Sequence, residues 1–130
     1  MKILIVEDDY ICRKVLKLIL TGYGEVDSAE DGQLGLNAAK EELDANKPYD
    51  LICLDVMMPN MDGQETLSKI REHERENGYD IGQGSKILMI TALSDHKNIM
   101  TSFKGECDGY IIKPVNKEAI AAKIQEIGLT

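Results

Sequence analysis

Short apolar runs alternate along the chain with longer segments in which apolar residues recur at helical spacing. The runs predict strands near residues 2–6, 24–28, 50–54, 86–90 and 109–112. The segments between them predict helices near residues 10–21, 32–45, 63–76, 95–104 and 117–127. This alternation is typical of an α/β fold with a parallel sheet, because each parallel strand needs a crossover to reach the next one.

Polar side chains stand where three of these apolar runs end. Asp55 closes the third run, Thr91 follows the fourth, and Glu7, Asp8 and Asp9 follow the first. Ligand crevices of open α/β sheets lie at the carboxyl ends of the strands. We therefore expect several carboxylates and one hydroxyl to face a common crevice, with Asp55 as a site residue.

Carboxylates that converge on one crevice repel each other unless a cation lies between them. Oxygen ligands suit Mg²⁺, which uses one or two carboxylates, keeps several waters and completes its shell on a phosphate. The alternative is that Glu7, Asp8 and Asp9 form a solvated turn and a helix N-terminus, where the helix dipole favours negative charge. On these residues alone, both interpretations stay open.

Lys113 follows the fifth apolar run and precedes a proline. Such a lysine is more often an exposed turn residue than part of a site. Together with Asp55, Thr91 and the acidic cluster, it becomes a counter-ion for an anion. A carboxylate nucleophile, a divalent metal, a hydroxyl and an ammonium group together favour phosphoryl transfer onto Asp55, which gives an acyl phosphate.

The length of 130 residues predicts one domain, residues 1–130. The formal net charge of -8 argues against direct binding of nucleic acid. Three widely spaced cysteines are interpreted as reduced thiols, which indicates a cytoplasmic location. No apolar run approaches the length of a membrane span, and the first residues lack the pattern of a signal peptide, so we expect no membrane association.

Several segments resemble the receiver domains of two-component response regulators, in particular the chemotaxis receiver. The resemblance covers nearly the whole chain in the right order and is carried by the segments 3–8, 54–59, 61–63, 91–92 and 110–114. It implies a flavodoxin-like, doubly wound sheet of five parallel strands in the order 2-1-3-4-5, with helices on both faces. It also implies a phosphorylation-dependent signalling switch that catalyses only its own phosphorylation and dephosphorylation.

The resemblance assigns roles to individual residues. Asp55 would accept the phosphoryl group from the phosphohistidine of a histidine kinase or a histidine phosphotransfer protein. Mg²⁺ would be bound by Asp55, by Asp8 and by the backbone carbonyl of Met57, and by Glu7 through water. Asp9 falls on the next position, which is variable in the family.

The resemblance also implies how phosphate is held and how the switch responds. Lys113 would pair with the phosphoryl oxygens, and the Thr91 hydroxyl and the Ala92 amide would bind another of them. Thr91 and Tyr110 would form the switch. The readout face would be the fourth helix, fifth strand and fifth helix, roughly residues 95–127. It would control a downstream protein partner or an output domain beyond residue 130.

Two features depart from the family pattern. The glycine-rich segment 76–85 makes the connection between Asp55 and Thr91 longer than expected, and we expect a long, mobile connection that forms a looped insertion beside the third helix. Met57 and Leu93 are apolar where related receivers can carry polar side chains that position the attacking water. We therefore expect slow loss of the phosphoryl group.

Other functions are weighed against the same residues. A haloacid-dehalogenase-like phosphatase needs a second aspartate two residues after the nucleophile, where this chain has Met57. A flavodoxin-like flavin binder needs a phosphate loop after the first strand, where Glu7, Asp8 and Asp9 would repel a flavin phosphate. A binding module that works without phosphorylation would not need Asp55, Asp8, Thr91 and Lys113.

Overall fold

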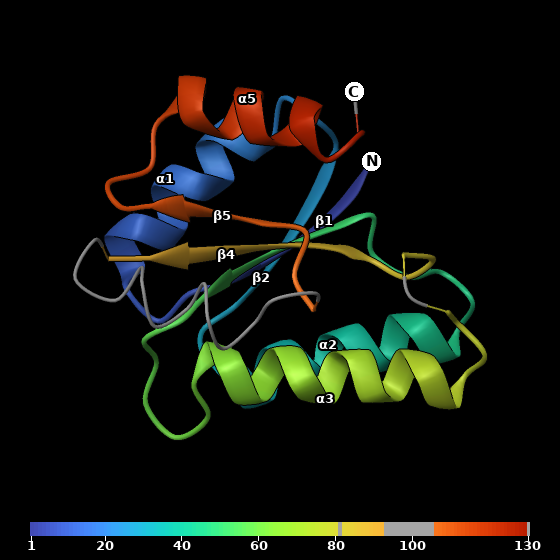
Figure 1. The fold of residues 1–130 in the computed structure, drawn as a ribbon. Helices are drawn as coiled ribbons and strands as arrows, with labels where there is room; N and C mark the ends of the chain where they lie inside the picture. Colours follow the sequence, from blue (N-terminus) through green and yellow to red (C-terminus); the bar gives the residue numbers. More distant parts are fainter. Residues whose placement is uncertain (81, 93–105, 130) are drawn as a thin grey trace.

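The computed structural model describes residues 1–80, 82–92 and 106–129 (Figure 1). Its sheet has five parallel strands in the order β2-β1-β3-β4-β5, which confirms the predicted flavodoxin-like topology. The strands are β1 (Lys2–Val6), β2 (Glu25–Ala29), β3 (Leu51–Asp55), β4 (Lys86–Thr91) and β5 (Gly109–Ile112).

The helices lie in two layers, one on each face of the sheet (Figure 1). They are α1 (Tyr10–Leu20), α2 (Gly32–Asp44), α3 (Gly63–Glu76) and α5 (Lys117–Glu126). Helices α1 and α5 cover one face, and α2 and α3 cover the other. The helix predicted at 95–104 and the predicted position Leu93 lie outside the described residues. In the part of the chain that the structure describes, no helix is long and apolar enough to cross a membrane.

Alternate residues of the central strands supply the two halves of the core. Leu54 of β3 points to the α2/α3 side and packs with Leu36 and Leu67, whereas Cys53 points to the other side and packs with Leu16 and Ile120. Every residue of β3 is buried because helices cover both faces, which explains why the strand reads as a continuous apolar run.

The strands keep their predicted positions to within one residue. Strand β3 begins and ends one residue later than predicted, because Asp55 still pairs with Ile90 in the ladder and the Val56 amide donates to the Ile90 carbonyl at 3.0 Å. Asp55 therefore belongs to the sheet itself. The backbone is held in the ladder at Asp55 and by the Val56 amide directly after it. The position from which the Asp55 side chain projects is therefore fixed.

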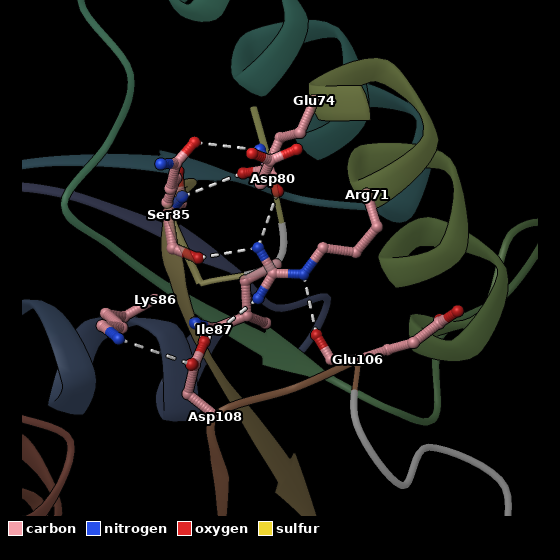
Figure 2. Close-up of polar contacts among 9 residues, drawn as sticks. Arg71, Glu74, Asp80, Ser85, Lys86, Ile87, Glu106 and Asp108 are labelled. Atoms are coloured by element: carbon pink, nitrogen blue, oxygen red, sulfur yellow. Dashed lines mark hydrogen bonds and ion pairs between the residues drawn. The ribbon is translucent and has the colours of Figure 1, made fainter. Parts of the chain in front are cut away.

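At the opposite end of the sheet, Arg71 of α3 joins three segments that are far apart in sequence (Figure 2). Its guanidinium donates to the carboxylates of Glu74 at 2.8 Å and Asp108 at 3.0 Å. It also donates to the carbonyls of Ser85 at 2.8 Å and Glu106 at 2.7 Å. Helix α3 is thereby tied to the residues that precede β4 and β5.

The carboxylates of this network also hold backbone amides. Glu74, which is buried, accepts from the Ser85 amide at 2.9 Å, and Asp108 accepts from the Ile87 amide at 2.8 Å. The Tyr79 amide donates to the Glu74 carbonyl at 2.9 Å. Both ends of the predicted insertion beside α3 are thus fixed by Glu74, and the starts of β4 and β5 have fixed positions.

Candidate functional site

Four strands bring the predicted polar residues to one edge of the sheet. Glu7 and Asp8 follow β1, Asp55 ends β3, Thr91 ends β4 and Lys113 follows β5. Carboxylate oxygens of Glu7, Asp8 and Asp55 all lie within 4.8 Å of one another, the one such acidic group among the described residues. The acidic residues expected to converge at the strand ends therefore do so.

Lys113 places its ammonium group among these carboxylates. Its Nζ lies 3.1 Å from Glu7 Oε1 and 3.4 Å from Asp55 Oδ1. Glu7 and Asp55 are buried, with 0% and 3% of their surface exposed, whereas 31% of the Lys113 side chain reaches solvent. One cation thus faces two buried carboxylates, and its open side faces the solution.

The two buried carboxyl groups do not ionise alike. Burial, and then the hydrogen bond and negative charge of Glu7, raise the pKa of Asp55 to about 8, although the Lys113 ammonium opposes the shift. Burial also acts to raise the pKa of Glu7, but polar contacts with Asp55, Cys12 and Lys113 outweigh it and hold that pKa at about 2. At neutral pH and without metal, the pair therefore retains one proton, and Asp55 is the group whose pKa is raised.

The acidic cluster has the chemistry of a site for a hard divalent cation. Glu7 Oε1 is buried and accepts no hydrogen bond from the described residues, although the Lys113 ammonium lies nearby. Such an unsatisfied carboxylate oxygen is costly unless a further cation or donor reaches it. The exposed Asp8 offers a third oxygen from the solvent side. The residues present therefore fit Mg²⁺, which prefers carboxylate oxygens and retains water.

Asp9 is separated from the cluster by its role in the helix. It is the N-cap of α1, and its Oδ1 accepts from the Ile11 amide at 3.0 Å.

Arg13 was not predicted to act in the site. Its Nη1 donates to the carbonyls of Glu7 at 2.8 Å and Asp8 at 3.4 Å and so holds the acidic loop. Because these are backbone carbonyls, side-chain pairing rules applied to the sequence do not reveal the contact.

The chain leaves β3 through a closely packed turn. The Gly63 amide donates to the Val56 carbonyl at 2.9 Å, and a Cβ at Gly63 would collide with the Asp55 carbonyl oxygen. Glycine is therefore required here so that α3 can begin against the end of β3. Met57 leaves this turn toward solvent, with 61% of its surface exposed.

Thr91 and Tyr110, the two residues predicted to form the switch, lie on the adjacent strands β4 and β5. Thr91 is 1% exposed, and its hydroxyl donates to the Ala92 carbonyl at 3.2 Å. The Lys113 amide donates to the Thr91 carbonyl at 2.7 Å, which ties the end of β4 to the end of β5. Tyr110 is half-buried and packs against the core on the α2/α3 side. The two side chains therefore come from adjacent strands.

An open groove of about 410 Å³ adjoins the cluster. One wall is the start of α1 and the other is the chain after β5, and its lining residues are Asp9, Ile11, Cys12, Val15, Lys113, Pro114 and Val115. Tyr10, Ile11 and Leu18 expose more than half of their surface along the same helix. The groove thus leads from Lys113 onto an apolar part of α1.

The chain is similar in sequence to known proteins. Residues 3–125 match the sequence profile described as the response regulator receiver domain. The chain is 35% identical to the regulatory protein VanRB of Enterococcus faecalis over 127 residues, which are 97% of this chain and 51% of that protein. It therefore spans about half the length of the curated relatives of this type that it matches.

Solved structures agree with the fold. The chemotaxis protein CheY4 of Vibrio cholerae superposes with a TM-score of 0.76 at 29% identity, covering 97% of each chain. The response regulator protein TrrA of Thermotoga maritima, solved in complex with Mg²⁺-BeF, gives a TM-score of 0.74 at 30% identity, covering 98% of this chain and 99% of that one.

Proposed function

The chain belongs to the response regulator receiver domain family, whose members are phosphorylation-dependent signalling switches, and we propose that Asp55 is its phosphorylation site. Residues 1–130 then act as one receiver unit. The comparisons do not support a haloacid-dehalogenase-like phosphatase or a binding module that works without phosphorylation. The observation that carries the proposal is that one buried aspartate lies 3.4 Å from an ammonium group and within 4.8 Å of two acidic side chains.

Asp55 has the position that a nucleophile for phosphoryl transfer needs. In the transfer, an Asp55 oxygen bonds to phosphorus, the phosphorus–nitrogen bond of a phosphohistidine breaks, and the imidazole keeps the electron pair. Lys113 balances the charge of one phosphoryl oxygen, and the Thr91 hydroxyl and the Ala92 amide bind another. The contacts of Lys113 with Asp55 and of the Lys113 amide with Thr91 support this arrangement, because they hold these groups around one point.

Asp8, Asp55 and the backbone carbonyl of Met57 would bind Mg²⁺ directly, with Glu7 acting through water. The ion supplies positive charge that screens the carboxylates from an incoming phosphoryl group. The unsatisfied Glu7 Oε1 and the exposed carboxylate of Asp8 support this assignment. The complex of TrrA with Mg²⁺-BeF supports it by analogy, since TrrA aligns along nearly its whole chain.

The proton on Asp55 gives Mg²⁺ a second role in the proposal. A protonated carboxyl group is a poor nucleophile, and the pKa of Asp55 is raised to about 8 by burial and by Glu7. Positive charge bound beside Asp55 favours the ionised form. Metal binding would therefore release this proton and activate the residue at neutral pH.

The phosphoryl donor would be a histidine kinase or a histidine phosphotransfer protein that docks over the groove beside α1. The groove is lined by Lys113 at one end, so a donor lying in it can reach Asp55. The exposed apolar side chains of Tyr10, Ile11 and Leu18 give a partner surface to bury. The net charge of -8 supports a protein partner rather than direct binding of nucleic acid.

The response would pass through Thr91 and Tyr110 to the region 95–127. Phosphorylation would draw the Thr91 hydroxyl toward the new oxygens, and Tyr110 on the adjacent strand would then change its packing. The readout would control a downstream protein or an output domain. The length of VanRB, about twice that of this chain, supports an output domain as one form of this partner.

The test is phosphorylation by acetyl phosphate, a small donor that needs no docking surface. We expect one added phosphoryl group by intact-mass spectrometry, formed only when Mg²⁺ is present. Asp55→Asn should gain none. Asp31→Asn removes a carboxylate that only caps α2, so this control should react like the unmodified protein. A phosphoryl mass on Asp55→Asn would refute the assignment.

A further inference from the structure

Met57 differs in exposure from the other internal methionines that the structure describes. It exposes 61% of its surface, whereas Met58, Met61 and Met89 expose 8%, 7% and 0%. The N-terminal Met1 is half-buried against the core. An oxidant dissolved in water therefore reaches the Met57 thioether before the buried ones.

The thiols of the chain do not compete well for such an oxidant. Cys53 is buried, and Cys12 and Cys107 are half-buried, whereas Met57 exposes 61% of its surface. A peroxide in solution therefore meets the Met57 sulfur more readily than any of the three thiols. Burial and Asp108 also raise the pKa of Cys107, and peroxides react with the thiolate rather than the thiol. A thioether needs no ionisation to react.

The position of Met57 connects its chemistry to Asp55. It follows Asp55 by two residues, and Val56 between them is buried. The chain bends at Val56, and consecutive Cα atoms are about 3.8 Å apart, so the Cα of Met57 lies at most about 7.6 Å from that of Asp55. Met57 is thus the exposed side chain that follows the buried Asp55 at the carboxyl end of β3.

We propose that Met57 is an oxidation site through which a peroxide shortens the lifetime of the phosphoryl group on Asp55. This inference rests on the proposed function of Asp55. The Met57 sulfur attacks one peroxide oxygen, the oxygen–oxygen bond breaks, and the leaving hydroxide takes the proton of the oxygen now bound to sulfur and becomes water. The sulfur is oxidised by two electrons, the peroxide is reduced, and the side chain becomes a sulfoxide.

The sulfoxide changes what the side chain can bind. A thioether sulfur is a weak acceptor, whereas the sulfoxide oxygen accepts hydrogen bonds strongly. Hydrolysis of an aspartyl phosphate requires a water molecule held in line behind the phosphorus. The sulfoxide oxygen of oxidised Met57 can hold that water. A glutamine at position 57 has a side chain of similar length and could hold it with its side-chain carbonyl oxygen. Oxidation therefore accelerates loss of the phosphoryl group.

The experiment compares decay of the phosphorylated protein before and after treatment with hydrogen peroxide. The protein is phosphorylated with acetyl phosphate and Mg²⁺ and then desalted, and its phosphoryl mass is followed with time. Peptide mapping locates the added oxygen. We expect oxidation first at Met57 and decay about tenfold faster, which corresponds to a barrier lowered by about 1.4 kcal/mol. Methionine sulfoxide reductases should restore the slow decay.

Two variants separate this role from general oxidative damage. Met57→Leu has no sulfur at this position, so its decay rate should be the same before and after peroxide. Met57→Gln carries a permanent acceptor, so it should decay faster than the unmodified protein without any peroxide. Both variants keep the backbone carbonyl.

Three results would overturn the inference. They are first oxidation at another residue, an unchanged lifetime after complete oxidation of Met57, and equal peroxide sensitivity in Met57→Leu. Failure of the untreated protein to take up any phosphoryl mass would instead overturn the proposed function, and this inference with it. The two failures are therefore distinguishable.

Discussion

The raised pKa of Asp55 makes the stability of the metal-free protein depend on pH. In the unfolded chain the carboxyl group has its ordinary pKa of 3.8 and is ionised above pH 5, whereas in the folded chain it keeps its proton up to about pH 8. The unfolded state therefore binds fewer protons in this window. The free energy of unfolding must fall as the pH rises from 5 to 8. Glu7 titrates below this window, because its pKa is lowered from 4.5 to about 2.

The size of the effect follows from the shift. One group that is protonated only in the folded state changes the free energy of unfolding by about 1.4 kcal/mol per pH unit. Between pH 5.5 and 7.5 Asp55 therefore contributes a loss of up to about 2.7 kcal/mol. This is a large part of the total stability of a domain of this size.

The assay is urea unfolding followed by circular dichroism at several pH values, without and with Mg²⁺. Asp55→Asn is the matched control, because it retains every other titrating group and lacks the one that shifts. The unmodified protein should lose stability relative to this variant as the pH rises, and Mg²⁺ should restore it most strongly near pH 8. Parallel pH profiles of the two proteins without metal would refute the reasoning.

Two further predictions concern the acidic loop and the opposite end of the sheet. Asp8→Asn should lower Mg²⁺ affinity about tenfold or more by calorimetry, because it removes a ligand charge, whereas Asp9→Asn should change it little, since asparagine also caps a helix. Arg71→Met should lower the free energy of unfolding by about 3 kcal/mol in urea, because it leaves Glu74 as a buried charge without its partner. Adding Glu74→Gln should recover part of that loss, and additive effects of the two changes would argue against their coupling.

The sequence was sufficient for the sheet and for most of the site, because both follow from where apolar runs end. Strand β3 reads as a continuous apolar run since both of its faces are covered, and the residue that ends it must then appear at the carboxyl edge of the sheet. Glu7, Asp8 and Lys113 were found in the same way, and the structure brings them together. The assignment of Asp8 rather than Asp9 to the cluster came from the family resemblance.

Contacts that depend on tertiary packing could not be predicted. The spacing of Arg71 and Glu74 by three residues on α3 is a usable signal for an ion pair. Nothing in the local pattern indicates that Ser85 and Asp108 complete the network, because they come from segments that meet only in the folded sheet. The unequal pKa values of Glu7 and Asp55 likewise depend on burial, which the sequence does not quantify.

Arg71 and Lys113 are the cations at the two ends of the sheet, and they differ in how completely their partners are hydrogen-bonded. We interpret the Arg71 end as stabilising and the Lys113 end as the proposed site. Arg71 makes four hydrogen bonds of 2.7 to 3.0 Å to groups that also accept from backbone amides or belong to the backbone, so its network is internally complete. Lys113 is shared between two carboxylates at longer distances, and Glu7 Oε1 beside it accepts no hydrogen bond from the described chain. The proposed function places a second cation and a phosphoryl group at this end. The same shortage of positive charge raises the pKa of Asp55, so the cost of the acidic cluster in the free protein and the proposed affinity for Mg²⁺ have one physical origin.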